Sequence, residues 1–156
     1  MYNYWMLGLA LFLTGCGGSG LSFTEPAALE QVLTQKWADF ADSWEAEDAT
    51  ACAALFHTNG QNLPPGNHTR TGRRDIADFY QLLFHANQSS EYAHTIESLE
   101  VCGDLAIEKG HFTVHWVRNN GTDWNYQART LAHWRRDDEG EWLLQTFIFN
   151  LPPVGQ

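Results

Sequence analysis

Residues 110–150 constrain the fold of this chain more than any other stretch, because they alternate like three consecutive antiparallel strands. We predict these strands at Gly110–Asn119, Asp123–Arg135 and Glu141–Asn150. The dipeptide Asn120-Gly121 favours a two-residue type I′ turn, in which both central residues have positive φ. A polar loop at Asp137–Gly140 joins the last two strands. The stretch therefore predicts an antiparallel meander.

These turns set the register of the strands, and the register decides which side chains share a face. If Asn119 pairs with Thr122, His115 lies opposite Tyr126. The same register predicts an inner face without a carboxylate, formed by His111, Thr113, His115, Trp124, Tyr126, Thr130, Gln145 and Phe147. The outer face then carries an apolar group: Phe112, Val114, Trp116, Leu144 and Ile148. That group would be exposed to solvent in a monomer, so it predicts a homodimer.

The preceding chain has the helical pattern needed to cover this sheet. Apolar residues recur at the 3.6 period from Leu29 to Trp44, and Asp48 is expected to cap a short helix over Ala49–Phe56. A third helix is predicted over roughly Arg73–Ala86, followed by a strand at Glu91–Val101. The expected fold class is therefore α+β, a cone-like curved antiparallel sheet covered by three N-terminal helices.

Length and charge narrow the class of protein further. At 156 residues the chain is expected to form one domain, over residues 24–152. Its 19 acidic and 9 basic residues give a formal charge of −10, which speaks against a nucleic-acid partner.

The N-terminus reads as a targeting segment. Trp5–Leu13 is apolar but too short to span a bilayer, which takes about 20 residues. Leu13-Thr14-Gly15-Cys16 follows, although no Lys or Arg precedes it. Residues 1–16 thus resemble a bacterial lipoprotein signal peptide with its lipobox, and 17–23 a flexible linker. The resemblance implies an exported protein, lipid-anchored at Cys16 to a membrane that faces the periplasm or cell exterior. An ordinary secretory signal or a short anchor is the alternative.

Two cysteines remain once Cys16 is set aside. In an oxidising compartment Cys52 and Cys102 are compatible with a disulfide. They are equally compatible with two thiols that behave as small hydrophobic groups. The sequence leaves both alternatives open.

Several short motifs follow one another along the chain, and their combined order is informative about the family. They are Glu47-Asp48, Ala54-Leu55-Phe56, Pro64-Pro65-Gly66, Thr71-Gly72-Arg73, Gly103-Asp104-Leu105-Ala106, His133-Trp134-Arg135-Arg136, Gly140-Glu141-Trp142 and Phe149-Asn150. With these motifs the chain resembles the nuclear transport factor two-like superfamily, over about residues 28–150. That superfamily includes ketosteroid isomerase and the SnoaL-like polyketide cyclases, and the likeness is strongest to an uncharacterised bacterial branch.

The resemblance also implies where the isomerase's catalytic groups would lie. Its general base corresponds to Leu63, its oxyanion-hole tyrosine to Phe40 and its protonated aspartate to Ala132. Proton abstraction beside a carbonyl needs a base and oxyanion donors, so isomerase activity is disfavoured. The same correspondence places Gln145, Phe147 and Phe149 in the pocket.

No metal or cofactor is expected. His111 and His115 are four residues apart on one strand, about 13 Å at about 3.3 Å per residue. Zinc–nitrogen bonds of about 2.0–2.1 Å cannot bridge that separation. The sequence also lacks a glycine-rich nucleotide-binding loop.

These observations leave three hypotheses for function. The first is an exported lipoprotein whose pocket binds a small, mostly apolar molecule through His111, Trp124, Thr130, Gln145, Phe147 and Phe40. The second is a SnoaL-like cyclase or dehydratase-type enzyme with His115 and Tyr126 as catalytic residues. The third is a dimeric interaction domain without a ligand, its cavity filled by its own tryptophans.

Overall fold

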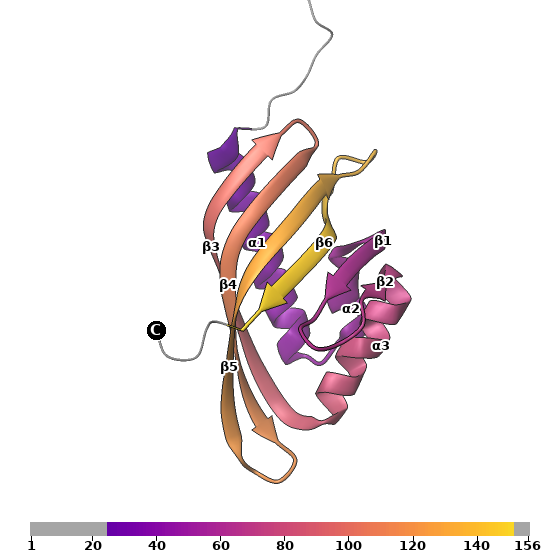
Figure 1. Ribbon diagram of the computed structural model, residues 1–156, viewed down its shortest axis with the longest axis vertical. Helices are drawn as coiled ribbons and strands as arrows, with labels where there is room; N and C mark the ends of the chain where they lie inside the picture. The colour runs from indigo at the N-terminus through magenta and orange to yellow at the C-terminus, as the bar shows by residue number, and fades with distance from the viewer. Residues whose placement is uncertain (1–24, 152–156) are drawn as a thin grey trace, which may run out of the picture.

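The computed structural model describes residues 25–151 (Figure 1). Its elements are α1 (Pro26–Glu45), α2 (Ala49–Ala54), β1 (Phe56–Leu63), β2 (Arg70–Thr71), α3 (Gly72–His85), β3 (Asn87–Cys102), β4 (Leu105–Arg118), β5 (Asp123–Arg136) and β6 (Trp142–Asn150). The predicted signal peptide with Cys16 and the linker 17–23 lie outside the described residues. None of the described helices is long and apolar enough to cross a membrane.

The strands form one six-stranded, curved sheet in the order β2-β1-β6-β5-β4-β3. The antiparallel meander of β3 to β6 confirms the predicted core of the sheet. β1 differs from the expectation of an all-antiparallel sheet, because it pairs with β6 in parallel. The three helices lie on one side of this sheet, with α1 beside β3 and the pair α2 and α3 beside β1 (Figure 1). The α+β fold class is therefore confirmed.

The helices form where the apolar period and the caps predict them. Pro26 occupies the first turn of α1, and the predicted apolar stripe is buried: Leu29, Leu33, Trp37, Phe40 and Trp44. The Asp48 carboxylate accepts a hydrogen bond from the Ala51 amide at 2.9 Å and so caps α2. α2 ends two residues earlier than predicted, because Phe56 begins β1 and is fully buried there.

The β4–β5 turn has one more residue than predicted. Arg118 pairs with Thr122, whose carbonyl accepts the Arg118 amide at 3.0 Å, so the loop comprises residues 119–121. Gly121 has a φ of 76°, but Asn120 does not have the positive φ that a type I′ turn requires. The Asn120 side chain instead accepts the Thr122 amide at 3.0 Å. The predicted register of this hairpin is therefore wrong by one residue.

The β5–β6 turn shows the same kind of shift. The Asp137 amide donates to the Glu141 carbonyl at 2.9 Å, which leaves a three-residue loop that ends at Gly140. A β-bulge beyond this turn shifts the pairing by one residue, since Trp134 pairs with Leu144 but Ala132 pairs with Phe147. Past the bulge, the inward and outward residues alternate as predicted. Consequently Phe147 and Phe149 face inward as predicted. Leu144 also faces inward, although the predicted register placed it on the outer face.

The corrected register reassigns the faces of β4. Phe112, Val114 and Trp116 face inward and are buried, while His111 and His115 belong to the outer face. The predicted outer apolar group is therefore wrong except for Ile148, which is 41% exposed. The inner face also contains a carboxylate, because Glu108 lies two positions from Gly110 on the inward side and is fully buried.

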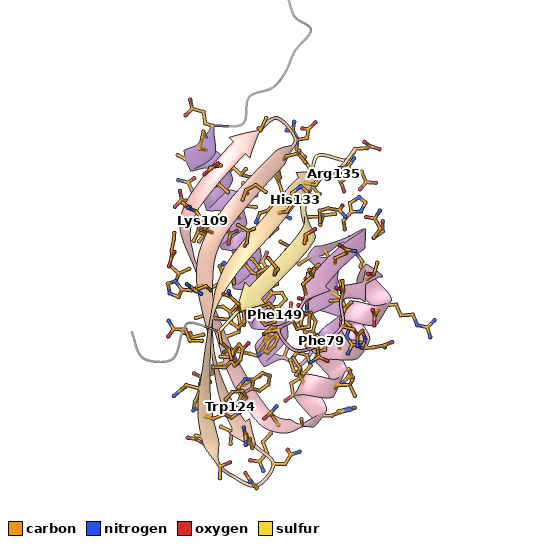
Figure 2. All side chains as sticks on the ribbon, in the orientation of Figure 1. Phe79, Lys109, Trp124, His133, Arg135 and Phe149 are labelled. Atoms are coloured by element: carbon orange, nitrogen blue, oxygen red, sulfur yellow. The ribbon has the colours of Figure 1, made fainter. Side chains whose placement is uncertain are left out.

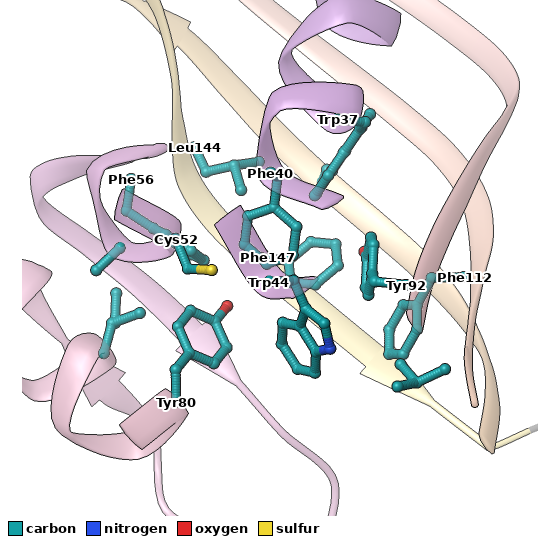
Figure 3. Packing of buried hydrophobic residues seen from close by; sticks show 14 of the residues in the cluster. Trp37, Phe40, Trp44, Cys52, Phe56, Tyr80, Tyr92, Phe112, Leu144 and Phe147 are labelled. Atoms are coloured by element: carbon teal, nitrogen blue, oxygen red, sulfur yellow. The ribbon is translucent and has the colours of Figure 1, made fainter. Parts of the chain in front are cut away.

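The core beneath the helices is largely aromatic. Figure 3 shows rings from α1, α3, β3, β4 and β6 packed against one another around Trp44. Cys52 and Cys102 are both free thiols, the first buried and the second exposed. The disulfide alternative is therefore not realised in this structure.

Candidate functional site

The candidate site is a cavity of about 210 Å³ between the inner face of the sheet and the helices α1 and α3. Eleven of its 17 lining residues are aromatic and none carries a charge, so its wall offers no opposite charge to an ionic group. The aromatic members are Phe40, Trp44, Phe79, Tyr80, Tyr92, Phe112, Trp116, Trp124, Tyr126, Phe147 and Phe149.

The elements bring these rings together from distant parts of the chain. In Figure 2, Phe79 of α3 and Phe149 of β6 lie on the same side of the sheet, and Lys109 of β4 points to the other side. Trp116 and Trp124 are opposed across the β4–β5 hairpin, with their rings stacked at 6.2 Å between centroids. The guanidinium of Arg118 lies 4.9 Å from the Trp124 ring. The hairpin thus supplies one wall of the cavity.

Half of the predicted site residues line this cavity. Phe40, Trp124, Tyr126 and Phe147 do so, which agrees with the prediction for β5 and β6 and with the resemblance for α1. The pairing of His115 with Tyr126 is wrong, because His115 is opposite Asn125 and Tyr126 is opposite Val114.

The two histidines of β4 contact acidic residues outside the cavity. His111 Nδ1 lies 2.9 Å from Glu97 Oε1, and His115 Nε2 lies 3.6 Å from Asp123 Oδ2. The His115 side chain is 38% exposed. A histidine in this position cannot reach a molecule bound among the inner rings, so the predicted His115–Tyr126 catalytic pair does not form.

The two remaining predicted ligand-binding residues are also outside the cavity wall. Thr130 is buried on the inner face, and its hydroxyl has no hydrogen-bond partner among the described residues. Gln145 occupies the β6 bulge, where its amide nitrogen lies 3.4 Å from Asn59 Oδ1. The bulge turns Gln145 away from the cavity, a displacement that simple strand alternation does not anticipate.

The titratable groups in the cavity wall are tyrosines. Burial raises the pKa of Tyr80 and of Tyr92 well above the ordinary value, and burial also raises the pKa of Tyr126. All three hydroxyls are therefore neutral near pH 7 and act as hydrogen-bonding groups rather than as bases. The wall consequently contains no group poised to abstract a proton at neutral pH.

A polar cluster beside the cavity was missed by the sequence analysis. The buried Glu108 carboxylate accepts hydrogen bonds from the indole nitrogens of Trp37, at 3.0 Å, and Trp134, at 2.7 Å. His94 Nε2 lies 2.6 Å from the other carboxylate oxygen. The Trp37 ring stacks on the His94 imidazole at 3.8 Å between centroids. The correct register of β4 would have identified Glu108, because it alternates with Phe112 and Val114.

This cluster reaches the cavity through one tyrosine. Tyr92 OH lies 3.2 Å from His94 Nδ1, and the Tyr92 ring lines the cavity. If the Glu108 carboxylate holds the proton of His94 on Nε2, the other ring nitrogen accepts from the Tyr92 hydroxyl. The chain of contacts therefore fixes the orientation of one aromatic wall residue. Between residues 25 and 151, no group of three or more His, Cys, Asp or Glu side chains is placed to hold a metal ion.

Comparison with known proteins agrees with this geometry. The family described as the SnoaL-like domain matches residues 37–144, a segment that includes the helices and most of the sheet. The comparison with curated proteins finds no match.

Solved structures of three proteins superpose on most of the chain. A nuclear transport factor 2 (NTF2-like) superfamily protein from Salmonella enterica serovar Typhimurium is 18% identical, with a TM-score of 0.72 over 83% of this chain and 95% of that one. A ketosteroid isomerase-like protein from Erwinia carotovora atroseptica is 16% identical, with a TM-score of 0.66 over 80% and 97%. A putative calcium/calmodulin dependent protein kinase II association domain from Xanthomonas campestris is 21% identical, with a TM-score of 0.66 over 88% and 95%. At these identities the structures establish the fold alone.

Proposed function

Since this chain belongs to the SnoaL-like domain family of the NTF2-like superfamily, we propose that its pocket domain binds a small, mostly apolar molecule. The observation that carries the proposal is the cavity whose 17 lining residues include 11 aromatic and no charged side chains. Ligand sites of this kind are largely apolar, with a few polar groups that orient the ligand.

The size of the cavity limits the size of the ligand. An apolar cavity of about 150 Å³ binds benzene, and pockets for drug-sized molecules begin at about 300 Å³. A cavity of about 210 Å³ therefore suits a molecule of one or two rings, or an aliphatic molecule of similar size. Because this space is open in the structure, the hypothesis of a cavity filled by its own tryptophans is not favoured.

Binding is favoured over catalysis by the chemistry of the wall. An acid–base enzyme needs a group that exchanges a proton near the working pH, and the wall tyrosines remain neutral there because burial raises the pKa of each. The two histidines of β4, His111 and His115, belong to the outer face. We therefore propose a binding module.

We further propose that the domain is exported and lipid-anchored through Cys16, as the signal sequence predicts. A homodimer also remains a proposal, and the corrected register moves its interface. On the outer face Leu131 pairs with Lys109 on one side and with Ile148 on the other. Leu131 and Ile148 are 43% and 41% exposed, which makes this part of the face a reasonable interface.

The neutral fluorescent two-ring probe 1-naphthylamine tests the binding function. We expect saturable 1:1 binding to the purified protein, with enhanced probe fluorescence in the apolar cavity. Leu83→Trp should abolish binding, because Leu83 lines the cavity and the larger side chain fills it. Leu82→Trp is the matched control, since Leu82 is its neighbour on α3 but is 63% exposed. Equal binding by both variants would overturn the proposal.

A further inference from the structure

We propose that the molecule bound in this cavity is uncharged and carries an acceptor oxygen, such as a carbonyl or ether oxygen, which accepts a hydrogen bond from the Trp44 indole. The inference rests on the proposed binding function and adds the chemical class of the ligand to it.

The Trp44 indole nitrogen lacks a hydrogen-bond partner within the protein. The side chain is 4% exposed and Nε1 is buried, with no acceptor among the described residues. Five aromatic rings surround the indole at 5.1 to 5.8 Å between centroids: Phe40, Tyr80, Phe84, Tyr92 and Trp116. In Figure 3 the indole nitrogen lies on the side of Trp44 that faces Phe112, another residue of the cavity wall. The donor is thus held among hydrocarbon surfaces beside the cavity.

An indole N–H is a donor only, and leaving a buried donor unpaired destabilises the folded protein. Buried polar groups in native proteins are nearly always paired, so each exception needs an explanation. A bound molecule with an acceptor oxygen would remove this cost at Trp44.

The distribution of paired and unpaired indoles supports this explanation. Trp37 and Trp134 donate to Glu108, and neither lines the cavity. Trp44 and Trp124 both line the cavity, and both have buried indole nitrogens without a partner in residues 25–151. The fold therefore provides a protein acceptor for the indole nitrogens of Trp37 and Trp134 and none for those of Trp44 and Trp124 at the cavity wall.

The same wall argues against a charged ligand. None of its lining residues is charged, so an ion transferred there would lose its solvation without gaining a compensating charge. A neutral oxygen acceptor loses far less and gains the hydrogen bond from the indole.

A matched pair of probes tests the inference. 2-Acetylnaphthalene and 2-isopropenylnaphthalene have nearly the same shape, but only the first has an acceptor oxygen. We expect the wild-type protein to bind the acetyl compound about tenfold more tightly, which corresponds to about 1.4 kcal/mol. Trp44→Phe keeps an aromatic ring but removes the N–H, so the preference should fall to about twofold or less. Trp142→Phe, a buried tryptophan outside the cavity wall, should retain the full preference.

The outcomes separate this inference from the binding function. Equal affinity of the wild-type protein for the two compounds would overturn the inference and leave the binding function intact. Binding of neither compound, together with no binding of 1-naphthylamine, would overturn the binding function. A preference that persists in Trp44→Phe would overturn the role of Trp44.

A second measurement on the wild-type protein avoids dependence on a variant that fails to fold. The ¹⁵N–¹H signal of the Trp44 indole should move downfield when 2-acetylnaphthalene is added, and it should move much less with 2-isopropenylnaphthalene. Identical shifts with the two compounds would count against the inference.

Discussion

The Glu108 carboxylate of β4 accepts a hydrogen bond at 3.0 Å from the Trp37 indole of α1, 71 positions earlier in the chain. This contact ties the first helix to the centre of the sheet. Glu108 is fully buried, and its remaining contacts are also with nitrogen atoms, from Trp134 and His94. A buried carboxylate requires such a set of partners, because without them the desolvation of its charge would oppose folding.

We expect Glu108→Gln to lower the free energy of unfolding by about 1–3 kcal/mol, because the amide nitrogen cannot accept the hydrogen bonds that the carboxylate oxygen accepts. Urea denaturation followed by tryptophan fluorescence measures the change. Glu100→Gln is the control, since Glu100 is exposed on β3 and should change stability by less than about 0.5 kcal/mol. Equal effects of the two substitutions would contradict a stabilising role for the cluster.

Gly110 is expected to tolerate no side chain. A Cβ at this position would collide with the Thr95 carbonyl oxygen and would lie 3.3 Å from His94 Nε2. Gly110→Ala should therefore push β3 away from β4 and destabilise the protein by about 1–3 kcal/mol. Thermal unfolding would detect the change, and an unchanged midpoint would show that the two strands are not held at this separation.

Stability should fall at alkaline pH because of Cys52. Burial raises the pKa of its thiol from 9.0 to about 12, and the nearby Asp48 carboxylate adds to the effect. Between these values the unfolded chain loses the proton while the folded protein keeps it, so stability is present below pH 9 and decreases as pH rises. The expected loss from this thiol is about 1.4 kcal/mol between pH 8 and pH 10.

Urea denaturation at pH 8, 9 and 10 measures this dependence. Cys52→Ala should flatten it by that amount, whereas Cys102→Ala, which removes an exposed thiol, should leave it unchanged. The same slope in the wild-type protein and Cys52→Ala would contradict the assignment.

The proposed homodimer can be tested on the outer face of the sheet. Ile148→Glu would place an unpaired charge between Leu131 and Leu63, where burial in an interface is costly. We expect light scattering at micromolar concentration to report a dimer for the wild-type protein and half that mass for the variant. Thr113→Glu, an exposed substitution on the same face, should remain dimeric. A monomeric wild-type protein would refute the prediction.

The lipid anchor is tested at Cys16. Cys16→Ser should leave the precursor unprocessed and release the protein from the membrane fraction, because the acyl chains would have no sulfur to carry them. Cys102→Ser is the control for the loss of a cysteine. Normal processing with unchanged membrane association would exclude the lipoprotein interpretation.

Much of the fold could be predicted from local patterns. The apolar period of α1, the Asp48 cap and the alternation of the last three strands each depend on neighbouring residues, and all three appear in the structure. The inward orientation of Trp124 and Tyr126 followed from the same alternation. Phe147 lines the cavity in keeping with the same alternation, and Phe40 lines it at the position that the family resemblance implied.

The candidate site was harder to predict, because a register shift of one residue between two strands changes which side chains line it. Because the turn has three residues instead of two, Phe112, Val114 and Trp116 lie on the inner face in place of His111 and His115. A one-residue change of register moves every side chain of a strand to the opposite face.

Local propensity and apolar periodicity therefore encode which segments become helices and strands, and they also encode the aromatic core of the domain. The face of β4 that lines the cavity depends instead on long-range packing, as does the burial of Glu108 rather than a histidine on that strand. The free-energy difference between two turn lengths is small and local, but burial of Phe112, Val114 and Trp116 against α1 and α3 acts over the whole sheet and selects the register that permits it.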